Sequence, residues 1–268
     1  METCNISLQG FSNIQYRKQR SGNAIVLLHG FPEDGTLWEQ VVPVLAKGFS
    51  VIVPDIPGSG GSKLEEQEIS IDALADSIAG ILEHEKIEEA VIVGHSMGGY
   101  IALSFAEKYR KQVKGLSLVH STATADTEEK KAARRKAIDL IKKGGKEPFV
   151  RGMIPNLFAA DFKELHPEII ERQIERGMKL SDTSMIAFYN AMINRRDRTN
   201  ILSSADFPVQ WIIGSEDNIV PLSSSLQQST LASVNYVSLY NCGHMSMIEA
   251  PERLANDLNT FGVYCYNR

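Results

Sequence analysis

The chain has 268 residues, of which 43% are hydrophobic and 23% charged, and its formal net charge is −5 at pH 7. This balance is typical of a folded globular protein, so it excludes a disordered or fibrous chain. An acidic chain lacks the strongly basic surface that nucleic-acid phosphates require, so we expect a small-molecule substrate and no nucleic-acid partner.

No segment predicts export, membrane insertion or a metal site. Residues 1–20 hold no apolar run long enough for the core of a signal peptide. The longest apolar runs are far shorter than the roughly 20 residues of a membrane-spanning helix. The cysteines are odd in number and lack metal-ligand spacing, and they are Cys4, Cys242 and Cys265. We therefore expect a cytoplasmic protein with no membrane insertion, no disulfide framework, no metal and no cofactor.

The N-terminal half predicts strands that alternate with helices. Residues 5–17 alternate apolar and polar side chains around a Gln-Gly pair, which indicates a β-hairpin. Runs rich in Val and Ile follow, of the kind buried on both faces of a sheet, at residues 24–28, 50–53, 90–93 and 116–119. Helical spacing separates them, over residues 71–82 with Ser70 as a cap, and over 100–109. Such units predict an α/β fold with a mostly parallel sheet.

The pattern becomes helical between residues 127 and 198, where no strand is predicted. Pro167 and Ser181 are placed to start helices, and Gly144-Gly145 to break one. Residues 128–151 carry nine Lys or Arg against four Asp or Glu. We interpret this run as a solvated helix face, because acidic residues interrupt it. Strands are predicted again at 209–213 and 234–239, and a final helix at 251–261.

A candidate nucleophile follows the strand predicted at residues 90–93. The segment from Gly94 to Gly98 reads G-x-S-x-G and leads into a helical pattern. A tight strand-to-helix turn would strain the backbone of Ser96, and the two flanking glycines remove side chains that would collide there. Ser96 would then lie at a helix N-terminus, where free N–H groups favour developing negative charge.

A serine nucleophile needs a general base, and the base needs a carboxylate to orient it. Asp217 follows the strand at 209–213, and His244 follows the strand at 234–239. Both leave the same edge of the sheet as Ser96, where active sites of open parallel sheets lie. The spacing alone leaves other acids and bases open, namely Glu216 and Asp126 as the acid and His29, His95 and His120 as the base.

Over nearly its whole length the chain resembles the α/β-hydrolase superfamily. The resemblance rests on segments in the family's order, at residues 29–32, 55–62, 94–99, 214–221, 243–244 and 249–252. It implies a twisted sheet with helices on both faces, a hydrolase core of residues 1–123 and 199–268, and a helical cap of residues 124–198. It also implies a set of site residues: Ser96 as nucleophile, Asp217 as acid, His244 as base, and the backbone N–H groups of Phe31 and Met97 as the oxyanion hole.

The activity inferred from this resemblance is hydrolysis of a carboxylic ester, lactone or thioester of a small, moderately apolar substrate through an acyl-enzyme on Ser96. Haloalkane dehalogenases and epoxide hydrolases carry Asp at this position, so neither activity is implied. Carbon–carbon bond hydrolysis, enol-lactone hydrolysis and perhydrolysis stay open, although carbon–carbon hydrolases commonly carry an aromatic residue where this chain has Met245. A ligand-binding signalling protein on a hydrolase scaffold is the alternative from another class. The sequence also leaves a homodimer open.

The cap residues give less specific expectations. Apolar candidates for the substrate pocket are Phe149, Met153, Phe158, Phe188 and Met192, each of which also suits helix packing. A substrate carboxylate would meet Arg195, Arg196 or Arg198, but we interpret these arginines as a solvated cluster.

Overall fold

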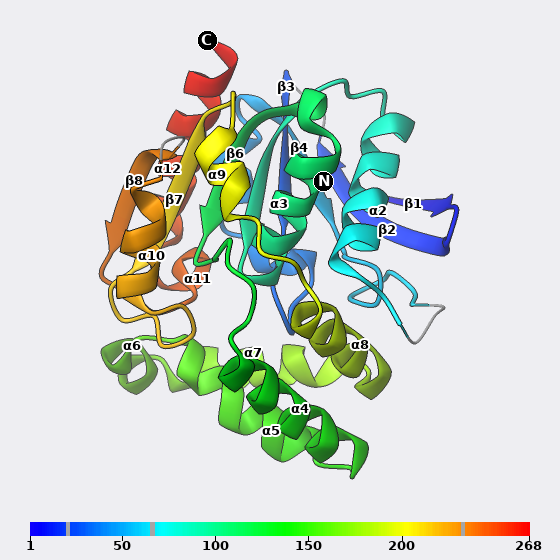
Figure 1. The fold of residues 1–268 in the computed structure, drawn as a ribbon, viewed down its shortest axis with the longest axis vertical. Helices are drawn as coiled ribbons and strands as arrows, with labels where there is room; N and C mark the ends of the chain where they lie inside the picture. Colours follow the sequence, from blue (N-terminus) through cyan, green and yellow to red (C-terminus); the bar gives the residue numbers. More distant parts are fainter. Residues whose placement is uncertain (20–21, 65–67, 232–233) are drawn as a thin grey trace.

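The computed structural model describes residues 1–19, 22–64, 68–231 and 234–268. Its strands form one eight-stranded sheet in the order β1-β2-β4-β3-β5-β6-β7-β8 (Figure 1). The predicted hairpin is confirmed by β1 (Glu2–Leu8) and β2 (Phe11–Gln19), which pair antiparallel, and β2 also pairs antiparallel with β4 (Phe49–Pro54). All later pairs are parallel, so the prediction of a mostly parallel sheet is confirmed.

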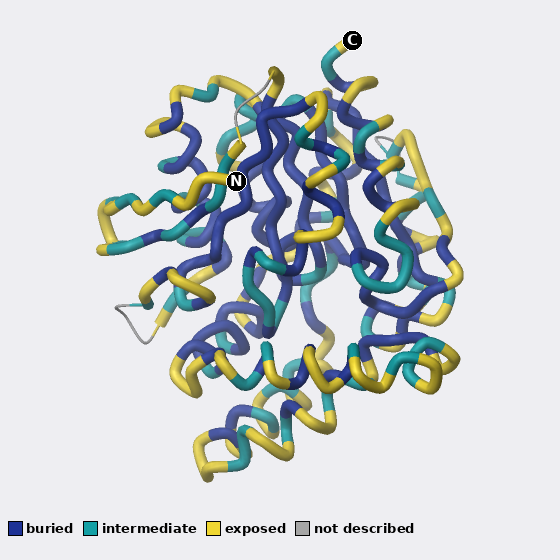
Figure 2. The backbone as a smooth tube through the Cα atoms, turned by 180° about the vertical axis from the view of Figure 1, so that it is seen from behind, coloured by how far each residue is buried: buried dark blue, intermediate teal, exposed yellow. Residues whose placement is uncertain are grey.

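The central strands are the buried runs that the sequence predicts. Residues of β4 are all buried. Those of the other inner strands are buried too, apart from the first residue of β3 and one position of β6. These strands are β3 (Asn23–Leu28), β5 (Ala90–His95), β6 (Val113–Val119) and β7 (Val209–Gly214). The last strand, β8 (Val234–Tyr240), lies at the edge of the sheet and is half exposed. Figure 2 shows the buried chain concentrated in the middle of the sheet.

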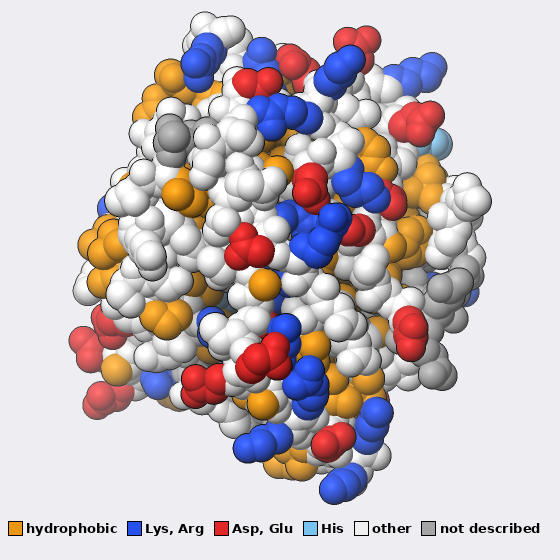
Figure 3. Space-filling view, in the orientation of Figure 1, with side chains coloured by type: hydrophobic (Ala, Val, Ile, Leu, Met, Phe, Trp, Pro, Cys, Tyr) orange, Lys and Arg blue, Asp and Glu red, His pale blue; other side chains and the backbone are white. Residues whose placement is uncertain are grey.

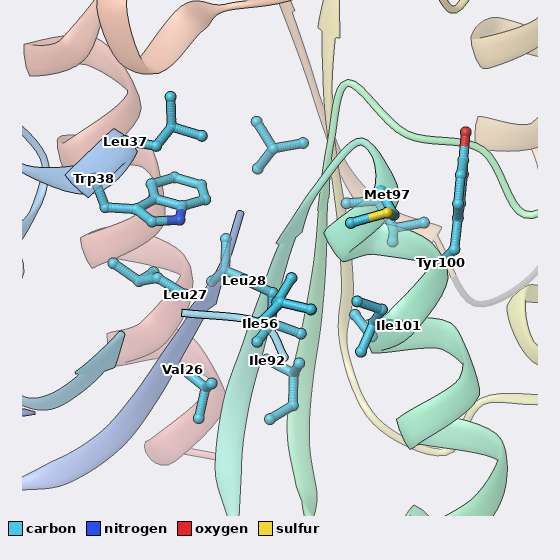
Figure 4. Close-up of a cluster of buried hydrophobic side chains, with 14 of the residues drawn as sticks. Val26, Leu27, Leu28, Leu37, Trp38, Ile56, Ile92, Met97, Tyr100 and Ile101 are labelled. Carbon is cyan, nitrogen blue, oxygen red and sulfur yellow. The ribbon is translucent and has the colours of Figure 1, made fainter. Parts of the chain in front are cut away.

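Helices cover both faces of the sheet. One face carries α2 (Ile71–His84) and α3 (Met97–Lys108), which pack against each other, and Ser70 caps α2 by accepting a hydrogen bond from the Ala73 N–H at 3.0 Å. The opposite face carries α1 (Val42–Leu45) and α12 (Pro251–Tyr266). Side chains of α3 and of β3 and β5 meet in one apolar cluster, which includes Leu28, Ile92, Met97 and Ile101 (Figure 4). This cluster anchors the start of α3 to the centre of the sheet.

The segment between β6 and β7 is helical, as predicted. It forms a layer below the sheet in Figure 1, made of α4 (Glu128–Lys142), α5 (Lys146–Met153), the 3-10 turn η3 (Ile154–Leu157), α6 (Ala160–Leu165), α7 (Pro167–Lys179) and α8 (Asp182–Ile193). Pro167 starts α7, and Ser181 caps α8 by accepting from the Ser184 N–H. Gly144, at φ +83°, separates α4 from α5. The division into a core and a cap of residues 124–198 stays a prediction.

Outside the helical segment of residues 127–198, the elements that the sequence does not predict are short. They are the 3-10 turns η1 (Gly35–Trp38) and η2 (Arg110–Gln112), and the helices α1, α9 (Thr199–Ser204), α10 (Leu222–Ser229) and α11 (Ser246–Glu249). None exceeds eight residues, so each is too short to show a helical period.

Among the residues that the structure describes, no helix combines the length and the apolar character that crossing a bilayer needs.

Candidate active site

Ser96 occupies the tight turn between β5 and α3. Its φ of 51° and ψ of −114° place a non-glycine residue in a strained part of backbone space. A Cβ on Gly94 would lie 2.3 Å from the Gly98 carbonyl oxygen, and a Cβ on Gly98 would lie 2.4 Å from the Leu28 carbonyl oxygen. Glycine is therefore needed on both sides of Ser96 for the turn to close against β3, as the motif predicts.

Neighbouring backbone and side-chain groups hold Ser96 in this turn. Its N–H donates to the Val119 carbonyl at 3.0 Å, and the Ser121 hydroxyl donates to the Ser96 carbonyl at 2.8 Å. Ser96 is half-buried, whereas the next residue, Met97, is fully buried in the apolar cluster of Figure 4. The turn is thus fixed to β6 on one side and to the core on the other.

Asp217 and His244 meet in a buried pair at the ends of β7 and β8. His244 Nδ1 lies 2.8 Å from Asp217 Oδ2, and each side chain is only 2% exposed. Asp217 Oδ1 accepts from the N–H groups of Ile219 at 2.8 Å and Val220 at 2.9 Å, which fixes the carboxylate. Burial acts to raise the pKa of Asp217, but His244 and His120 beside it lower the pKa far more. The carboxylate is therefore ionised and able to orient an imidazole.

His95, the residue before Ser96, contacts the candidate base His244. His95 Nε2 donates to the His244 carbonyl at 3.0 Å, and the centroids of the two rings lie 4.9 Å apart. No hydrogen bond joins Ser96 Oγ to His244 among the described residues. Contacts between a nucleophile and its base commonly tighten when substrate binds. The structure therefore places His244 against the neighbour of Ser96, without a hydrogen bond to Ser96 itself within the ranges that the structure describes.

His120, one of the alternative bases, lies on the other side of Asp217. Its Nδ1 is 3.5 Å from Asp217 Oδ2, and its Nε2 is 2.7 Å from Ser246 Oγ. Burial lowers the pKa of His120, which keeps its imidazole neutral. Ligand atoms of His120, Asp217 and His244 all lie within 4.8 Å of one another, close enough in principle for one metal ion. However, the short hydrogen bond from His244 occupies the carboxylate oxygen that would ligate a metal.

The loop after β3 packs against the start of α3. His29 is buried, and its Nδ1 donates to the Gly30 carbonyl at 2.8 Å while its Nε2 accepts from the Ile56 N–H at 3.0 Å. The peptide bond from Phe31 to Pro32 is cis. The ring of Phe31 lies 4.7 Å from that of Tyr189 and 6.4 Å from that of Phe188, between centroids. His29 is thus structural, and Phe31 joins this loop to α8.

The remaining alternatives have other partners. Glu216 is exposed, and Asp126 is bound by Arg134 and Arg195, so Asp217 is the carboxylate that pairs with His244 in the described part of the chain. His95 has a pKa far below the usual value, because burial and the nearby histidines disfavour its charged form. Cys242 is buried, and burial raises its thiol pKa, as expected for a packing residue rather than a reactive thiol.

The expectation of a solvated arginine cluster is wrong for two of the three arginines. Arg195 donates to the carbonyls of Met192 and Thr124, both at 3.0 Å, and is buried. Arg198 is also buried and pairs with Asp72 and Glu107, whereas Arg196 is exposed. The acidic partners of Arg198 belong to α2 and α3, which are far away in sequence, so local composition does not reveal them.

The apolar cap candidates divide into two groups. Phe188 contacts Phe31, while Phe149 and Met153 contact Tyr189, with the rings of Phe149 and Tyr189 5.8 Å apart. The other two are buried, and they are Phe158, which stacks on Phe162, and Met192. Phe31, Phe149, Met153, Phe188 and Tyr189 form what we call the aromatic cluster, which joins the loop after β3 to α5 and α8.

Two glutamates near the site make contacts that the sequence does not predict. The Glu33 side chain is only 7% exposed, and its Oε2 lies 3.7 Å from His95 Nδ1. Burial of this carboxyl raises its pKa to about 7, although His244 partly opposes the shift. Glu249 lies in a segment that matches the family, and its carboxylate accepts from three backbone N–H groups: those of Gly243 at 3.1 Å, Met245 at 3.2 Å and Ala159 at 3.0 Å. Glu249 thereby ties the loop of His244 to the helical segment.

Comparisons with known proteins agree with this geometry. The sequence model of the alpha/beta hydrolase fold family matches residues 23–251. The solved structure of a thermophilic esterase from Thermogutta terrifontis, with malate bound, is 29% identical and superposes with a TM-score of 0.92 over 99% of both chains.

Curated relatives match to different extents. The 2-hydroxymuconate semialdehyde hydrolase of Pseudomonas sp. strain CF600 is 27% identical, over 90% of this chain and 87% of its own length. An uncharacterised protein of Mycobacterium tuberculosis is 39% identical over 104 residues, so the match spans only 30% of that protein and 39% of this chain. With the family model covering most of the sequence, the chain belongs to the α/β-hydrolase fold family.

Proposed function

We propose that this protein is a serine esterase that forms an acyl-enzyme on Ser96. The observation that carries the proposal is the buried hydrogen bond of 2.8 Å between His244 and Asp217, held beside the strained turn of Ser96. This arrangement supplies a nucleophile, a base and an orienting carboxylate at one edge of the sheet, which is what acyl transfer requires.

In the proposed reaction, His244 Nε2 takes the proton of the Ser96 hydroxyl as Oγ attacks the ester carbonyl. The oxyanion that forms accepts hydrogen bonds from the N–H groups of Phe31 and Met97. His244 then gives its proton to the departing alkoxide, which leaves as an alcohol. Water attacks the acyl-enzyme after losing a proton to His244, and the proton returns to Ser96 as the carboxylic acid leaves.

The similarity to the Thermogutta esterase, which is 29% identical over nearly the full chain, supports ester hydrolysis. Malate is a small dicarboxylate, so its binding by that esterase makes a carboxylate-bearing ligand compatible with this architecture. Carbon–carbon bond hydrolysis is the second candidate, because the chain is 27% identical to the Pseudomonas semialdehyde hydrolase. The residue after His244 favours the ester, since the buried Met245 stands where carbon–carbon hydrolases commonly carry an aromatic residue.

Hydrolysis of p-nitrophenyl acetate and butyrate tests the proposal. We expect Ser96→Ala to lower kcat/KM by about 10³-fold or more, because the acyl-enzyme can no longer form. Ser203→Ala, the same change at an exposed hydroxyl on α9, is the control and should keep wild-type activity. Unchanged turnover by Ser96→Ala would exclude Ser96 as the nucleophile. Faster cleavage of a vinylogous 1,5-diketone than of any ester would favour the carbon–carbon candidate instead.

A further inference from the structure

One basic side chain of α4 is turned inward, toward the aromatic cluster. Residues 128–151 are interpreted from sequence as a solvated helix face, and Figure 3 shows acidic and basic side chains mixed across the visible surface. Arg134 departs from this pattern, because its side chain is only 20% exposed. The next residue, Arg135, is exposed. The helix therefore half-buries the Arg134 side chain and leaves that of Arg135 exposed.

The contacts of Arg134 place it across from the loop after β3. Arg134 Nε donates to Asp126 Oδ2 at 2.7 Å, and the Asp126 side chain is fully buried. The guanidinium carbon lies 5.4 Å from the centroid of the Tyr189 ring, which in turn packs on Phe31 at 4.7 Å. Tyr189 therefore contacts both the guanidinium and the ring of Phe31, whose backbone N–H is one of the proposed oxyanion donors.

On the nucleophile side of the site, Tyr100 is covered by the second arginine that pairs with Asp126. Tyr100 lies one helical turn after Ser96 in α3, and its ring is covered by Arg195, whose guanidinium carbon is 4.0 Å from the ring centroid. Burial acts to lower the pKa of Arg134, but Tyr100 and Asp126 beside it produce a net upward shift. The guanidinium is thus charged, and it lies beside Tyr189 of α8.

Arg134 and Arg195 both pair with Asp126, but they differ in how many of their nitrogen atoms donate hydrogen bonds. Arg195 Nη1 lies 2.8 Å from Asp126 Oδ1, and its Nη atoms also donate to two carbonyls. For Arg134, the hydrogen bond to Asp126 is the one made within the described part of the chain, and it uses Nε. Asp197, the other acid near Arg195, accepts from the N–H groups of Thr199 and Ala125. Two guanidinium groups therefore share one buried carboxylate. The two Nη atoms of Arg134, which form its Nη edge, make no hydrogen bond within the described part of the chain.

We propose that the Nη edge of Arg134 binds a carboxylate of the substrate, so that the preferred esters carry a second, ionised carboxyl group. The planar guanidinium matches a carboxylate in two parallel hydrogen bonds, and Asp126 holds it in place for that contact. This inference rests on the proposed esterase function of Ser96. It gives a role to the half-buried cation that α4 holds beside Tyr189, and it places a charged group next to the aromatic cluster.

Matched pairs of esters test the subsite in the wild-type protein. Monomethyl glutarate and methyl pentanoate differ only by a carboxylate in place of a terminal methyl on the acyl side. The anion 4-acetoxybutanoate and butyl acetate differ in the same way on the alcohol side. We expect the charged member of one pair to have the higher kcat/KM, and the pair that shows it identifies the side on which Arg134 binds. Equal kcat/KM within both pairs would overturn the proposal.

Two variants of α4 separate the subsite from general effects of charge. Arg134→Met should lower the ratio of charged to neutral kcat/KM by about tenfold or more, the usual effect of losing one charge-assisted hydrogen bond. Arg135→Met removes the same charge from the exposed neighbour and should leave the ratio at its wild-type value. An equal fall of the ratio in both variants would overturn the proposal, because it would indicate a long-range field rather than a contact.

A direct measurement of ligand binding tests the carboxylate subsite of Arg134 independently of the proposed esterase activity. In Ser96→Ala protein, whose fold is checked by circular dichroism, calorimetric titration with glutarate should show binding that Arg134→Met weakens about tenfold or more. Binding that is lost with Arg134 while the wild type hydrolyses no ester would refute the esterase function and keep the subsite. Glutarate that binds equally well with and without Arg134, or not at all, would overturn the subsite while leaving ester hydrolysis untouched.

Discussion

At the scale of single residues, Asp217 combines four contacts around one carboxylate. One oxygen faces the imidazoles of His244 and His120, and the other accepts two backbone N–H groups. Replacing it by Asn would put an amide N–H against His244 and favour the wrong tautomer of the base. We expect Asp217→Asn to lower kcat on p-nitrophenyl butyrate by about 10⁴-fold.

The adjacent Glu216 offers a matched control for this change. Glu216 is exposed, so Glu216→Gln removes the same type of charge without touching His244. Steady-state kinetics should show nearly wild-type kcat for Glu216→Gln. The assignment of the acid would be wrong if the loss appeared in Glu216→Gln and not in Asp217→Asn.

Glu33 makes stability depend on pH. The groups that face it are His95, His244 and Asp34, and burial raises its pKa from 4.5 to about 7. Between pH 4.5 and 7 the unfolded chain releases this proton while the folded protein keeps it, so the contribution of Glu33 to stability falls as pH rises through that window. Glu33→Gln should therefore be more stable than the wild type at pH 8, by on the order of 1–3 kcal/mol, and close to it at pH 4.5.

Urea unfolding at pH 4.5 and pH 8 measures this difference. The exposed Glu216→Gln variant is again the control, and its difference from the wild type should change little between the two pH values. A Glu33→Gln variant that is less stable than the wild type at pH 8 would show that the ionised carboxylate stabilises the fold.

Local sequence patterns predicted Ser96 and placed Asp217 and His244 among several candidate acids and bases, and the resemblance to the α/β-hydrolase superfamily singled out these two. The patterns did not predict the contacts of Glu33 or the second histidine on Asp217. Those depend on which strand ends become neighbours in the sheet, and no local motif carries that information. The structure adds these contacts, while the catalytic roles of the three residues stay proposals.

At the scale of elements, the turn between β5 and α3 depends on backbone packing that no larger residue permits. A Cβ on Gly98 would lie 2.4 Å and 2.6 Å from the carbonyl oxygens of Leu28 and His29, which belong to β3 and its loop. Because these are backbone atoms, the strand or the helix must move. We expect Gly98→Ala to lower the free energy of unfolding by on the order of 2–4 kcal/mol and to reduce ester hydrolysis.

Gly152 in α5 is the matched control for Gly98. A Cβ there would meet no atom within 4 Å, so Gly152→Ala should be neutral or stabilise the protein by up to about 1 kcal/mol. Urea unfolding of both variants gives the comparison. Similar stability of the two variants would contradict the close approach of α3 to β3.

The elements that sequence predicts well are those with long patterns. The buried runs of β3 to β6 and the apolar face of α2 have lengths that show a period. Helices such as α10 and α11 are polar or span a single turn, and contacts with the rest of the fold decide their conformation. Similarly, the edge position of β8, and hence its exposure, follows from the strand order of the whole sheet.

At the scale of the whole molecule, the helical segment between β6 and β7 is hydrogen-bonded to the loop that carries His244, the candidate base. The His244 N–H donates to the Leu157 carbonyl at 2.7 Å, and Glu249 accepts from Ala159 as well as from Gly243 and Met245. The position of His244 therefore depends on η3 and its neighbours. The helical pattern of the sequence predicts an insertion here, but not this attachment.

Glu249→Gln tests the attachment. The amide keeps the size of the side chain but turns one acceptor into a donor that faces backbone N–H groups. We expect a loss of on the order of 1–3 kcal/mol in the free energy of unfolding, together with slower ester hydrolysis. Glu252→Gln, an exposed change on the following helix, should leave both unchanged. Full activity and stability of Glu249→Gln would show that the loop of His244 does not need this link.

The most direct test of the account is to locate the covalent intermediate. Wild-type protein is treated with a fluorophosphonate, and separately quenched during turnover of p-nitrophenyl butyrate, and the modified residue is identified by peptide mass spectrometry. We predict one adduct per chain on Ser96 with both reagents, and slower labelling when His244 is replaced by Ala. An adduct on another residue such as Cys242, or the absence of any adduct on folded protein that hydrolyses the ester, would contradict the account.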